Sequence, residues 1–375
     1  MSYFFELPLI TDLTEDQQMA LDELKSIAIS GGAGTGKTVV SLWRHIQNME
    51  TSNKYSVIVT YTKTLGHYLS MSVTAIENNK KYKLKNITPP SRQVFTLKDF
   101  NKLEGQWKVH EIIIDEAQDL KLETLKKIKT HADTISYGAD FNQQLYEKTV
   151  NEKEIKNLFG KNIEYNLQQN FRNSYHILNF VKGILPNFHI SQSTLDELKD
   201  ENIGIKPIMF ISNDFEKEIE KIIEIINEFK SDTHNIAILL PFGETNDYTK
   251  EQSVDKYYDE LKNKGISCSK YYNKMKTDNI EIDNIHITTF KSAKGLEFNT
   301  VIIPEFHKFK DNVKKVSVVN EEDYYVAFTR TKKNLYLMSS EKLDFIDNDI
   351  CEIEYLKDNY NSKYISNRNN DDIPF

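Results

Sequence analysis

A glycine-rich run between a predicted strand and a predicted helix constrains this chain more than any other feature of its sequence. The run GGAGTGKT, residues 31–38, follows the apolar segment Ser26–Ser30 and leads into the helical segment Thr38–Asn48. Glycines let backbone amides curl around an anion, and the N-terminus of a helix points further amides at it. The run therefore predicts an α/β domain with a phosphate-binding loop. The alternative is a glycine-rich turn that binds nothing.

Four residues of this run carry the expected chemistry. Gly34 and Gly36 would cradle the phosphates, and the ammonium group of Lys37 would reach the β- and γ-phosphates of a nucleoside triphosphate. The hydroxyl of Thr38 would ligate a magnesium ion. The sequence therefore predicts ATP and Mg²⁺ as cofactors.

A hydrophobic segment that ends in two carboxylates supports the same site. Three isoleucines, residues 112–114, are followed directly by Asp115 and Glu116. Asp115 would hold the magnesium ion through water, and Glu116 would orient and deprotonate the attacking water. Taken alone, the two acids could be ordinary surface residues. Paired with the phosphate loop, they indicate a site at the carboxyl ends of parallel strands.

The rest of the chain alternates short apolar segments with longer helical ones, which is typical of parallel sheets. Two such series follow one another, so we expect two α/β domains in tandem. The predicted strands are Ser26–Ser30, Tyr55–Thr60, Val94–Leu97, Glu111–Ile114 and Thr134–Gly138 in the first series, and Lys206–Ile211, Asn235–Pro241, Ile285–Phe290, Thr300–Pro304 and, as the last, Asn334–Ser339 in the second. The predicted helices are Thr38–Asn48, Leu122–His131, Asp214–Lys230 and Ser253–Asn263.

Composition limits the class of protein. A chain of 375 residues suits two domains of ordinary size. No apolar run reaches the roughly 18 residues that a membrane helix needs, and we see no signal peptide, so we expect a cytoplasmic protein with no membrane partner. The two cysteines, Cys268 and Cys351, cannot build a disulfide framework. Since the net charge is −8, any nucleic acid must be held locally by a groove, backbone amides and stacking.

The segment Asp115-Glu116-Ala117-Gln118-Asp119 resembles the second motif of the superfamily 1 helicases of the UvrD, Rep and PcrA type. Further segments resemble the other motifs of that family, in the same order, over roughly residues 10–340. The resemblance implies two tandem RecA-like parallel-sheet domains with the ATP site in the cleft between them. We expect the first domain at residues 1–163, the second at 164–345 and a polar tail at 346–375, of which Asp358–Phe375 would be mobile.

The resemblance also implies roles around the nucleotide. Gln17 is similar to the glutamine that reads adenine, and Phe171 to the aromatic residue that stacks on it. Arg172 and Arg330 resemble the two arginines that contact the γ-phosphate, and Gln143 resembles the residue that senses it. The expected catalytic residues are then Lys37, Glu116, Gln143, Arg172 and Arg330, with Gly295 and Glu297 of the fifth motif joining the nucleotide site.

A single strand of nucleic acid is the substrate that the resemblance implies, with DNA expected and RNA as the alternative. Tyr61 resembles an aromatic residue that stacks on a base, and Thr96 a threonine that contacts a phosphate. The expected nucleic-acid contacts are Tyr61, Thr62, Thr96, Tyr146, Thr289 and Lys291.

Two large inserted subdomains of the family are expected to be absent from this chain. The intervals from Thr96 to Asp115 and from Tyr272 to His286 are too short to hold them. We therefore weigh a translocase or helicase against a regulatory ATPase subunit that drives a partner such as a nuclease. A role in DNA repair or in phage biology fits either. A third hypothesis, a nucleotide-binding protein without motor function such as a kinase, is disfavoured by the paired arginines.

Three single positions also depart from the family pattern. Val39 stands where the family usually has an arginine beside adenine, which predicts looser base selectivity. Lys148, two residues after Tyr146, stands where the family often has a tryptophan that stacks on DNA. Lys291 replaces the usual histidine of the fifth motif, and its cation could still meet a phosphate.

The last five residues resemble the acidic tip of bacterial single-strand-DNA-binding proteins. Such a tip offers a flexible acidic tether, an apolar anchor and a terminal carboxylate for a basic pocket. The expected partners are therefore the proteins that bind this tip, and the alternative is an acidic tail that arose by chance. The residues concerned are Asp371, Asp372, Ile373, Pro374 and Phe375.

Overall fold

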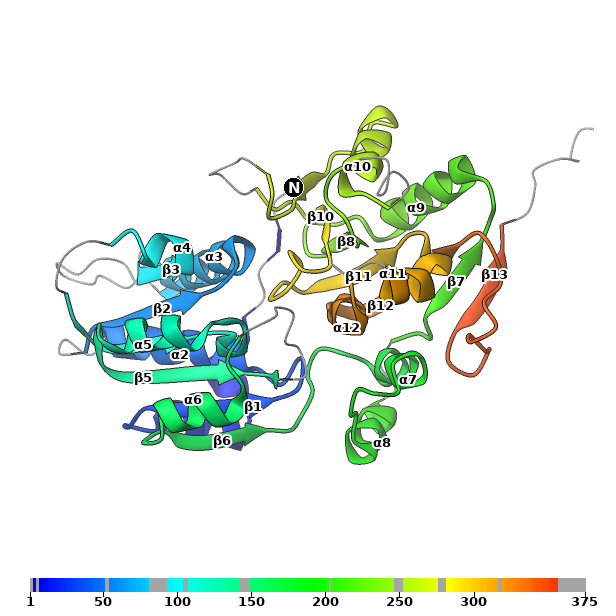
Figure 1. The fold of residues 1–375 in the computed structure, drawn as a ribbon. Coiled ribbons are helices and arrows are strands. Elements are labelled where there is room, and N and C mark those ends of the chain that lie inside the picture. Colours follow the sequence, from blue (N-terminus) through cyan, green and yellow to red (C-terminus); the bar gives the residue numbers. More distant parts are fainter. Residues whose placement is uncertain are drawn as a thin grey trace, which may run out of the picture.

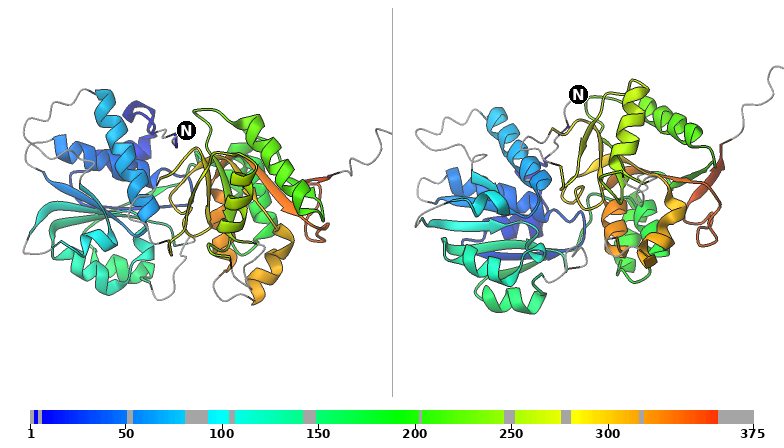
Figure 2. Two further views of the ribbon diagram at one scale, coloured as in Figure 1. Left: turned by 90° about the horizontal axis from the view of Figure 1, so that it is seen from above. Right: turned by 45° about the horizontal axis from the view of Figure 1, so that its top comes forward.

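Two α/β bodies lie side by side, with the N-terminal segment between them (Figures 1 and 2). The computed structural model describes residues 3–4, 7–50, 54–80, 93–103, 107–141, 149–201, 204–245, 252–275, 281–315 and 319–356. None of the helices within these ranges is long and apolar enough to cross a membrane.

The first body is built on a parallel sheet that has six strands within the described residues, in the order β3-β2-β4-β5-β1-β6. These strands are β1 (Ile27–Gly31), β2 (Ser56–Thr60), β3 (Val94–Thr96), β4 (Val109–Ile114), β5 (Ala132–Ala139) and β6 (Ile163–Leu167). The helices are α1 (Glu15–Asp22), α2 (Lys37–Glu50), α3 (Lys63–Lys80), α4 (Leu97–Phe100), α5 (Leu122–Lys129) and α6 (Glu152–Leu158), with short 3-10 helices η1 (Ile10–Asp12) and η3 (Ala117–Asp119).

The second body is built on a parallel sheet with seven strands among the described residues, in the order β13-β7-β12-β11-β8-β10-β9. These strands are β7 (Ile208–Ile211), β8 (Ile236–Leu240), β9 (Ser269–Tyr271), β10 (Ile285–Thr289), β11 (Phe298–Ile303), β12 (Thr331–Ser339) and β13 (Glu352–Tyr355). The helices are α7 (Tyr175–Ile184), α8 (Gln192–Glu201), α9 (Phe215–Phe229), α10 (Val254–Asn263), α11 (Phe309–Lys315) and α12 (Glu321–Thr329), with the 3-10 helix η5 (Phe306–Lys308).

The two sheets share one topology. Read from one edge, the first sheet runs β6-β1-β5-β4-β2-β3 and the second runs β13-β7-β12-β11-β8-β10, with β9 added at the far edge. Apart from β9, the strands of the two bodies therefore have the same spatial order. In each body, the last strand along the chain pairs with the first. The expected α/β fold with two tandem RecA-like parallel-sheet domains is confirmed.

Both faces of the second sheet are buried, because successive side chains of its central strands pack into two separate cores. In β8, Ile236 and Ile238 pack against α9 and α10, whereas Ala237 and Leu239 face the aromatic side of α12. All four are fully buried. This two-sided burial explains why the central strands are continuous apolar runs without polar alternation.

The prediction that Asn334–Ser339 is the last strand is wrong. β13 follows it and pairs in parallel with β7 at the edge of the second sheet. Its residues Glu352, Glu354 and Tyr355 are exposed, so no apolar pattern marks it in the sequence. Residues 352–355 of the expected tail therefore lie in the sheet. Two further strands, β6 and β9, were also absent from the predicted set.

Residues near the N-terminus contact the second body although their sequence position assigns them to the first. The Tyr3 amide donates to the carbonyl of Ile282, and Asn235 exchanges two hydrogen bonds with the backbone of Phe4. The ring of Tyr3 packs edge-on against Tyr68 of α3. The expected boundary after residue 163 coincides with the start of β6, and the division into domains stays a prediction.

Candidate active site

The glycine-rich run forms a loop between β1 and α2, at the carboxyl edge of the first sheet. Gly34 and Gly36 have φ values of +74° and +86°. A Cβ atom at Gly34 would lie 2.6 Å from the Cβ of Arg172, and one at Gly36 would collide with the side-chain amide of Gln17. Only glycine combines a positive φ with the absence of a Cβ atom. These glycines let the backbone amides of the loop turn toward an anion.

The ammonium group of Lys37 lies inside this loop. Its Nζ donates to the carbonyls of Gly31 and Gly32 at 2.8 and 2.7 Å, and it lies 4.0 Å from Asp140. Burial lowers the pKa of Lys37, an effect that the charges of Asp140 and Glu116 partly offset. A phosphate in the loop would give this cation the anion that it lacks at short range.

Thr38 and Asp115 meet at the start of α2 and the end of β4. The Thr38 hydroxyl donates to Asp115 Oδ2 at 3.0 Å. Both side chains offer oxygen atoms, which are the ligands that Mg²⁺ prefers, and Mg²⁺ usually keeps several waters beside one or two carboxylates. This pair therefore fits the predicted magnesium site.

Glu116 has a backbone conformation that is rare outside glycine. Its φ and ψ are 59° and 48°, and only one other non-glycine residue among the described ones, Glu305, has a positive φ. This conformation turns the chain from β4 directly into η3.

The two adjacent carboxyls have opposite pKa shifts. Burial, together with the charge of Glu116, raises the pKa of Asp115 to about 7. Burial acts in the same direction on Glu116, but Lys294, Lys37 and Arg330 outweigh it and lower its pKa to about 2. The neighbouring cations therefore favour the ionised form of Glu116, which is the form that a group deprotonating water needs.

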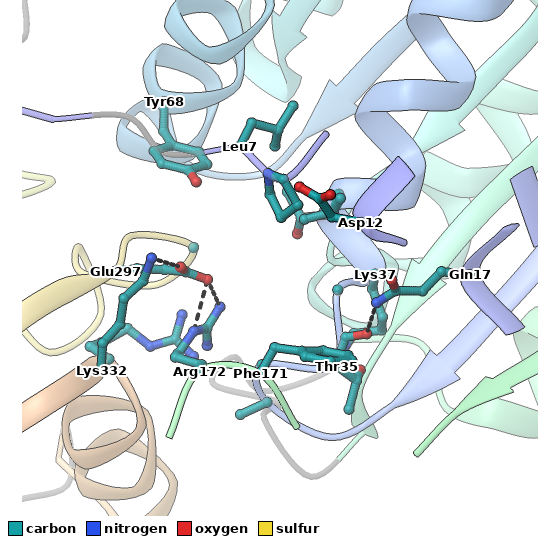
Figure 3. Close-up of a pocket in the computed structure, with 18 of the residues that line it drawn as sticks. Leu7, Asp12, Gln17, Thr35, Lys37, Tyr68, Phe171, Arg172, Glu297 and Lys332 are labelled. Carbon is teal, nitrogen blue, oxygen red and sulfur yellow. Dashed lines mark hydrogen bonds and ion pairs between the residues drawn. The ribbon is translucent and has the colours of Figure 1, made fainter. Parts of the chain in front are cut away.

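A pocket of about 520 Å³ opens between the two bodies at this point (Figure 3). In Figure 3, Arg172 and Glu297 face Lys37 and Thr35 across the pocket. The second body and its connecting segment thus supply one wall, and the phosphate loop supplies the other. Of the residues predicted for the nucleotide site, the pocket is lined by Gln17, Gly34, Gly36, Lys37, Thr38, Glu116, Phe171, Arg172, Gly295, Glu297 and Arg330.

The two predicted arginines hold different partners. Nε of Arg172 donates to Glu297 Oε1 at 2.8 Å, and Lys332 Nζ lies 3.2 Å from the other oxygen of Glu297. Arg330 is 1% exposed, and its Nε donates to the carbonyl of Val326 at 3.2 Å. Burial and the charge of Arg172 lower the pKa of Arg330 to about 9. An anion between the two guanidinium groups would relieve this repulsion.

Two residues at the mouth of the pocket match the expected adenine site. Gln17 Oε1 accepts from the amide of Thr14 at 3.1 Å, and its Nε2 donates to the carbonyl of Thr35 at 3.0 Å. These bonds fix the amide beside the phosphate loop. Phe171 is 53% exposed, and a large exposed aromatic ring beside a pocket can stack on a base.

Three threonines predicted to contact nucleic acid have hydroxyls engaged within the chain. Thr62 accepts from the Leu65 amide at 3.2 Å, Thr96 caps α4, and Thr289 donates to the Ser292 hydroxyl at 2.9 Å. These bonds shape the loops in which the residues lie. Beside Thr96 is a second pocket of about 370 Å³, lined by Lys63, Gly66, His67, Ser70, Val94, Thr96, Lys98, Asp99 and Lys102.

The other predicted nucleic-acid residues lie apart from the nucleotide pocket or beyond the described ranges. Tyr61 follows β2, and Lys291 Nζ lies 3.7 Å from the buried carboxylate of Asp323. Outside the described residues are Gln143, Tyr146, Lys148 and the terminal segment Asp371–Phe375. The roles of all these residues stay predictions.

One buried cation beside Glu116 was missed as a site residue. Lys294 Nζ lies 2.9 Å from Asp119 Oδ2 and 3.5 Å from Glu116 Oε2, and its side chain is 1% exposed. Lys294 lies within the segment that resembles the fifth motif, between Lys291 and Gly295, but it was given no role there. A lysine in a loop is normally exposed. Only the docking of the second body on the first brings these charges together.

Two family models match this chain. The model described as Schlafen group 3, DNA/RNA helicase domain matches residues 25–263. The model described as UvrD-like helicase C-terminal domain matches residues 244–342. The first match contains the phosphate loop and Glu116, and the second contains Glu297 and Arg330.

Curated relatives are similar at low identity. A protein of Acanthamoeba polyphaga mimivirus named Putative ATP-dependent DNA helicase is 23% identical over 337 residues, which are 84% of this chain and 46% of that protein. The RecBCD enzyme subunit RecB of Chlamydia pneumoniae is 28% identical over 142 residues, 38% of this chain and 11% of that subunit. The chain thus spans less than half the length of these relatives.

Among solved structures, Arterivirus nonstructural protein 10, a helicase, resembles this chain with a TM-score of 0.40 at 14% identity. The similarity covers 86% of this chain and 61% of that one.

Proposed function

This chain belongs to the family of the Schlafen group 3 DNA/RNA helicase domain, whose model matches residues 25–263, and from this premise we propose that it is an ATP-driven motor of superfamily 1 that moves along single-stranded DNA. One observation carries the proposal. A single pocket is lined by Lys37 and Glu116 from the first body and by Arg172 and Arg330 from the other side. Two bodies that share one nucleotide can convert its hydrolysis into relative motion.

We assign the chemistry of the reaction to the phosphate-loop wall. Lys37 would bind the β- and γ-phosphates, and Thr38 with Asp115 would hold Mg²⁺. A bound Mg²⁺ ion supplies charge neutralisation at the phosphates. Glu116, in its ionised form, would orient the attacking water and accept its proton. Gln143 keeps its predicted role beside the γ-phosphate.

The arginines would couple the chemistry to closure of the two bodies. Arg172 is held by Glu297, and the buried Arg330 lies in the repulsive field of Arg172. A γ-phosphate between the two guanidinium groups would replace Glu297 as the partner of Arg172 and would offset the repulsion at Arg330. Since the phosphate would also be bound by the first body, these contacts would draw the two bodies together. Loss of the γ-phosphate after hydrolysis would release them. Gly295 and Glu297 would close the ribose side of the pocket.

The base of the nucleotide would stack on Phe171, with Gln17 at its edge. Val39 also lines this pocket, and its apolar side chain offers no hydrogen bond to a base. We therefore propose ATP as the substrate, with weaker discrimination against other nucleoside triphosphates than an arginine at this position would provide.

A strand of nucleic acid would run past the ends of β2, β3 and β10. The pocket beside Thr96 supports this path, because three lysines, Lys63, Lys98 and Lys102, line it together with His67. Such a local basic groove is what an acidic chain needs to hold phosphates. Tyr61, Thr62, Tyr146, Thr289 and Lys291 keep their predicted roles as contacts along this path.

We propose the junction between β6 and α7 as the domain boundary, since β6 pairs with β1 in the first sheet. The tail segment Asp371–Phe375 keeps its predicted role in binding proteins that recognise the tip of single-strand-DNA-binding proteins. The alternative of a regulatory subunit that drives a nuclease gains no specific support from the site.

The proposed function is tested by ATP turnover of the full chain with and without single-stranded DNA. We expect severalfold stimulation by single-stranded DNA and displacement of a strand from a tailed duplex. The same assay with an RNA strand of the same sequence shows whether DNA or RNA stimulates ATP turnover. Blunt duplex DNA serves as the control. A preparation that is folded but hydrolyses no ATP with either strand would contradict the proposal.

A further inference from the structure

Lys294 crosses from the second body to the first, beside Glu116, the proposed general base. Its Nζ lies 2.9 Å from Asp119 Oδ2 and 3.5 Å from Glu116 Oε2. The side chains of Lys294 and Asp119 are each 1% exposed. A buried cation with two carboxylates is costly to separate, because each partner left behind would be an uncompensated charge.

The segment that carries Lys294 is docked on the first body at two further points. The hydroxyl of Thr64, at the start of α3, donates to the carbonyl of Ser292 at 2.8 Å. Gly295 has a φ of +84°, and a Cβ atom there would collide with the side chain of Leu65. Residues 292–295 therefore reach their position only when the second body rests against α3.

The carboxylate of Glu116 is held from two directions. The Gln118 side-chain amide donates to Glu116 Oε2 at 2.5 Å from within the same turn. Lys294 approaches the same oxygen from the other body. Both partners therefore contact Oε2. A glutamate that must orient a water needs one oxygen anchored and the other directed toward the nucleotide.

Lys294 keeps its charge at this buried position. Burial lowers the pKa of Lys294, but the charges of Asp119 and Glu116 more than offset this effect. A charged ammonium group is therefore available to anchor the carboxylate of Glu116.

We propose that Lys294 is a positioning residue for hydrolysis, which anchors the Glu116 carboxylate only while the two bodies are docked. Water activation then depends on the second body even though Glu116 and the phosphate loop both belong to the first. The inference rests on the proposed function, because it makes ATP hydrolysis at the proposed site depend on the docking of the second body. It differs from the role of the arginines, which would act on the γ-phosphate.

The test compares K294M, which removes the charge at similar length, with K294R, which keeps it. We expect K294M to lower kcat for ATP by about 10- to 100-fold, the usual effect of losing a partner that orients a reacting group. KM and the Kd of a non-hydrolysable ATP analogue should stay within about threefold, since Lys294 would not bind the nucleotide. K294R should retain more of kcat than K294M.

A second variant and a control guard against trivial loss of activity. D119N removes the other partner of Lys294 with little change in shape, and we expect it to lower kcat in the same direction. K270M serves as the matched control, because Lys270 forms an ion pair with Asp255 at 2.6 Å in the second body. K270M should keep the wild-type kcat. Circular dichroism and thermal unfolding establish that each variant is folded.

Two outcomes would overturn the inference. One is a folded K294M with a kcat within about twofold of wild type, and the other is a loss confined to nucleotide binding. A wild-type chain without any ATP turnover would contradict the proposed function instead. Turnover that E116Q abolishes and K294M retains would leave the proposed function intact and reject only the role of Lys294.

Discussion

The left-handed backbone of Glu116 recurs at one equivalent point of the second body. Glu305 follows β11 as Glu116 follows β4, and both have αL torsions before a 3-10 helix. Such torsions cost on the order of 1–3 kcal/mol for a residue other than glycine. The shared conformation comes from the shared topology, but only Glu116 faces the nucleotide pocket.

This pair gives a matched test of the catalytic assignment. We predict that E116Q lowers ATP turnover by a factor of about 10²–10⁴ while leaving ATP binding intact, since the amide keeps the shape but cannot accept the proton. E305Q changes the same residue type in the same backbone conformation and should keep turnover. Steady-state ATPase assays measure the turnover of each variant, and equilibrium binding measures its affinity for ATP. Equal losses in both variants would point to folding as the cause.

A second buried acid predicts how stability depends on pH. Burial raises the pKa of Glu218 to about 7, and the nearby charge of Glu305 adds to this, although Tyr257, Lys256 and Lys308 oppose it. The folded state therefore holds a proton that the unfolded state releases near its ordinary pKa of about 4.5. The contribution of Glu218 to stability is greatest below that value and falls as the pH rises toward 7.

We predict that E218Q makes the protein more stable than wild type at pH 8, by about 1–3 kcal/mol, and that the two converge near pH 4.5. The amide can still accept the hydrogen bond that Tyr257 donates at 2.5 Å. Urea unfolding at a series of pH values measures the difference. A gap between the two proteins that does not change with pH would reject this explanation.

Within the elements, a buried polar network joins α2 to the first sheet. Nε of Arg44 donates to Glu111 Oε1 at 2.8 Å, and its other nitrogens donate to the carbonyls of Glu23 and Lys25. Asn48 donates to the second oxygen of Glu111. The network sets the position of the helix that begins at the phosphate loop, so the scaffold of the site depends on it.

We predict that R44M destabilises the protein by about 3–5 kcal/mol, because it leaves the Glu111 carboxylate buried without a cation. K108M is the control, since Lys108 and Asp133 form an ion pair whose side chains are each 57% exposed. Removing that pair should change stability by less than about 1 kcal/mol. Denaturant unfolding measures both, and similar effects in the two variants would contradict the argument.

At the scale of the whole molecule, the two bodies are held together by a charged interface around the pocket and by the N-terminal segment. Tyr3 packs edge-on against Tyr68 of the first body and Phe298 of the second. Lys294 of the second body pairs with Asp119 of the first at 2.9 Å, and Arg172, Glu297 and Lys332 form one chain of charges on the second wall of the pocket. A ligand that contacts both walls would therefore stabilise the assembly as a unit.

We predict that a non-hydrolysable ATP analogue with Mg²⁺ raises the thermal unfolding temperature. At 100 times its Kd, a ligand that binds only the folded state adds about 2.7 kcal/mol. Chelation of Mg²⁺ should reduce the shift, and K37A should nearly abolish it. R330A should weaken it because the second wall loses its contact. An unchanged shift in K37A would place the nucleotide elsewhere.

The sequence by itself determined the features that depend on residues close together in the chain. The phosphate loop, the paired acids after β4 and the central strands all carry local signals, namely glycines, a carboxylate pair and apolar runs buried on both faces. The presence of two α/β domains in tandem also followed, since two series of strands and helices succeed one another along the chain. The RecA-like arrangement of their strands was implied by the family resemblance.

Tertiary structure alone decided the rest. β13 is an exposed, polar edge strand, and its identity comes from hydrogen bonds to β7 rather than from its own side chains. Lys294 lies beside Glu116 because the second body docks on α3, which the sequence around Lys294 does not specify. The pattern of apolar and polar residues within a segment specifies which of its side chains are buried. Contacts between charged residues of distant segments depend on how the two bodies pack against each other.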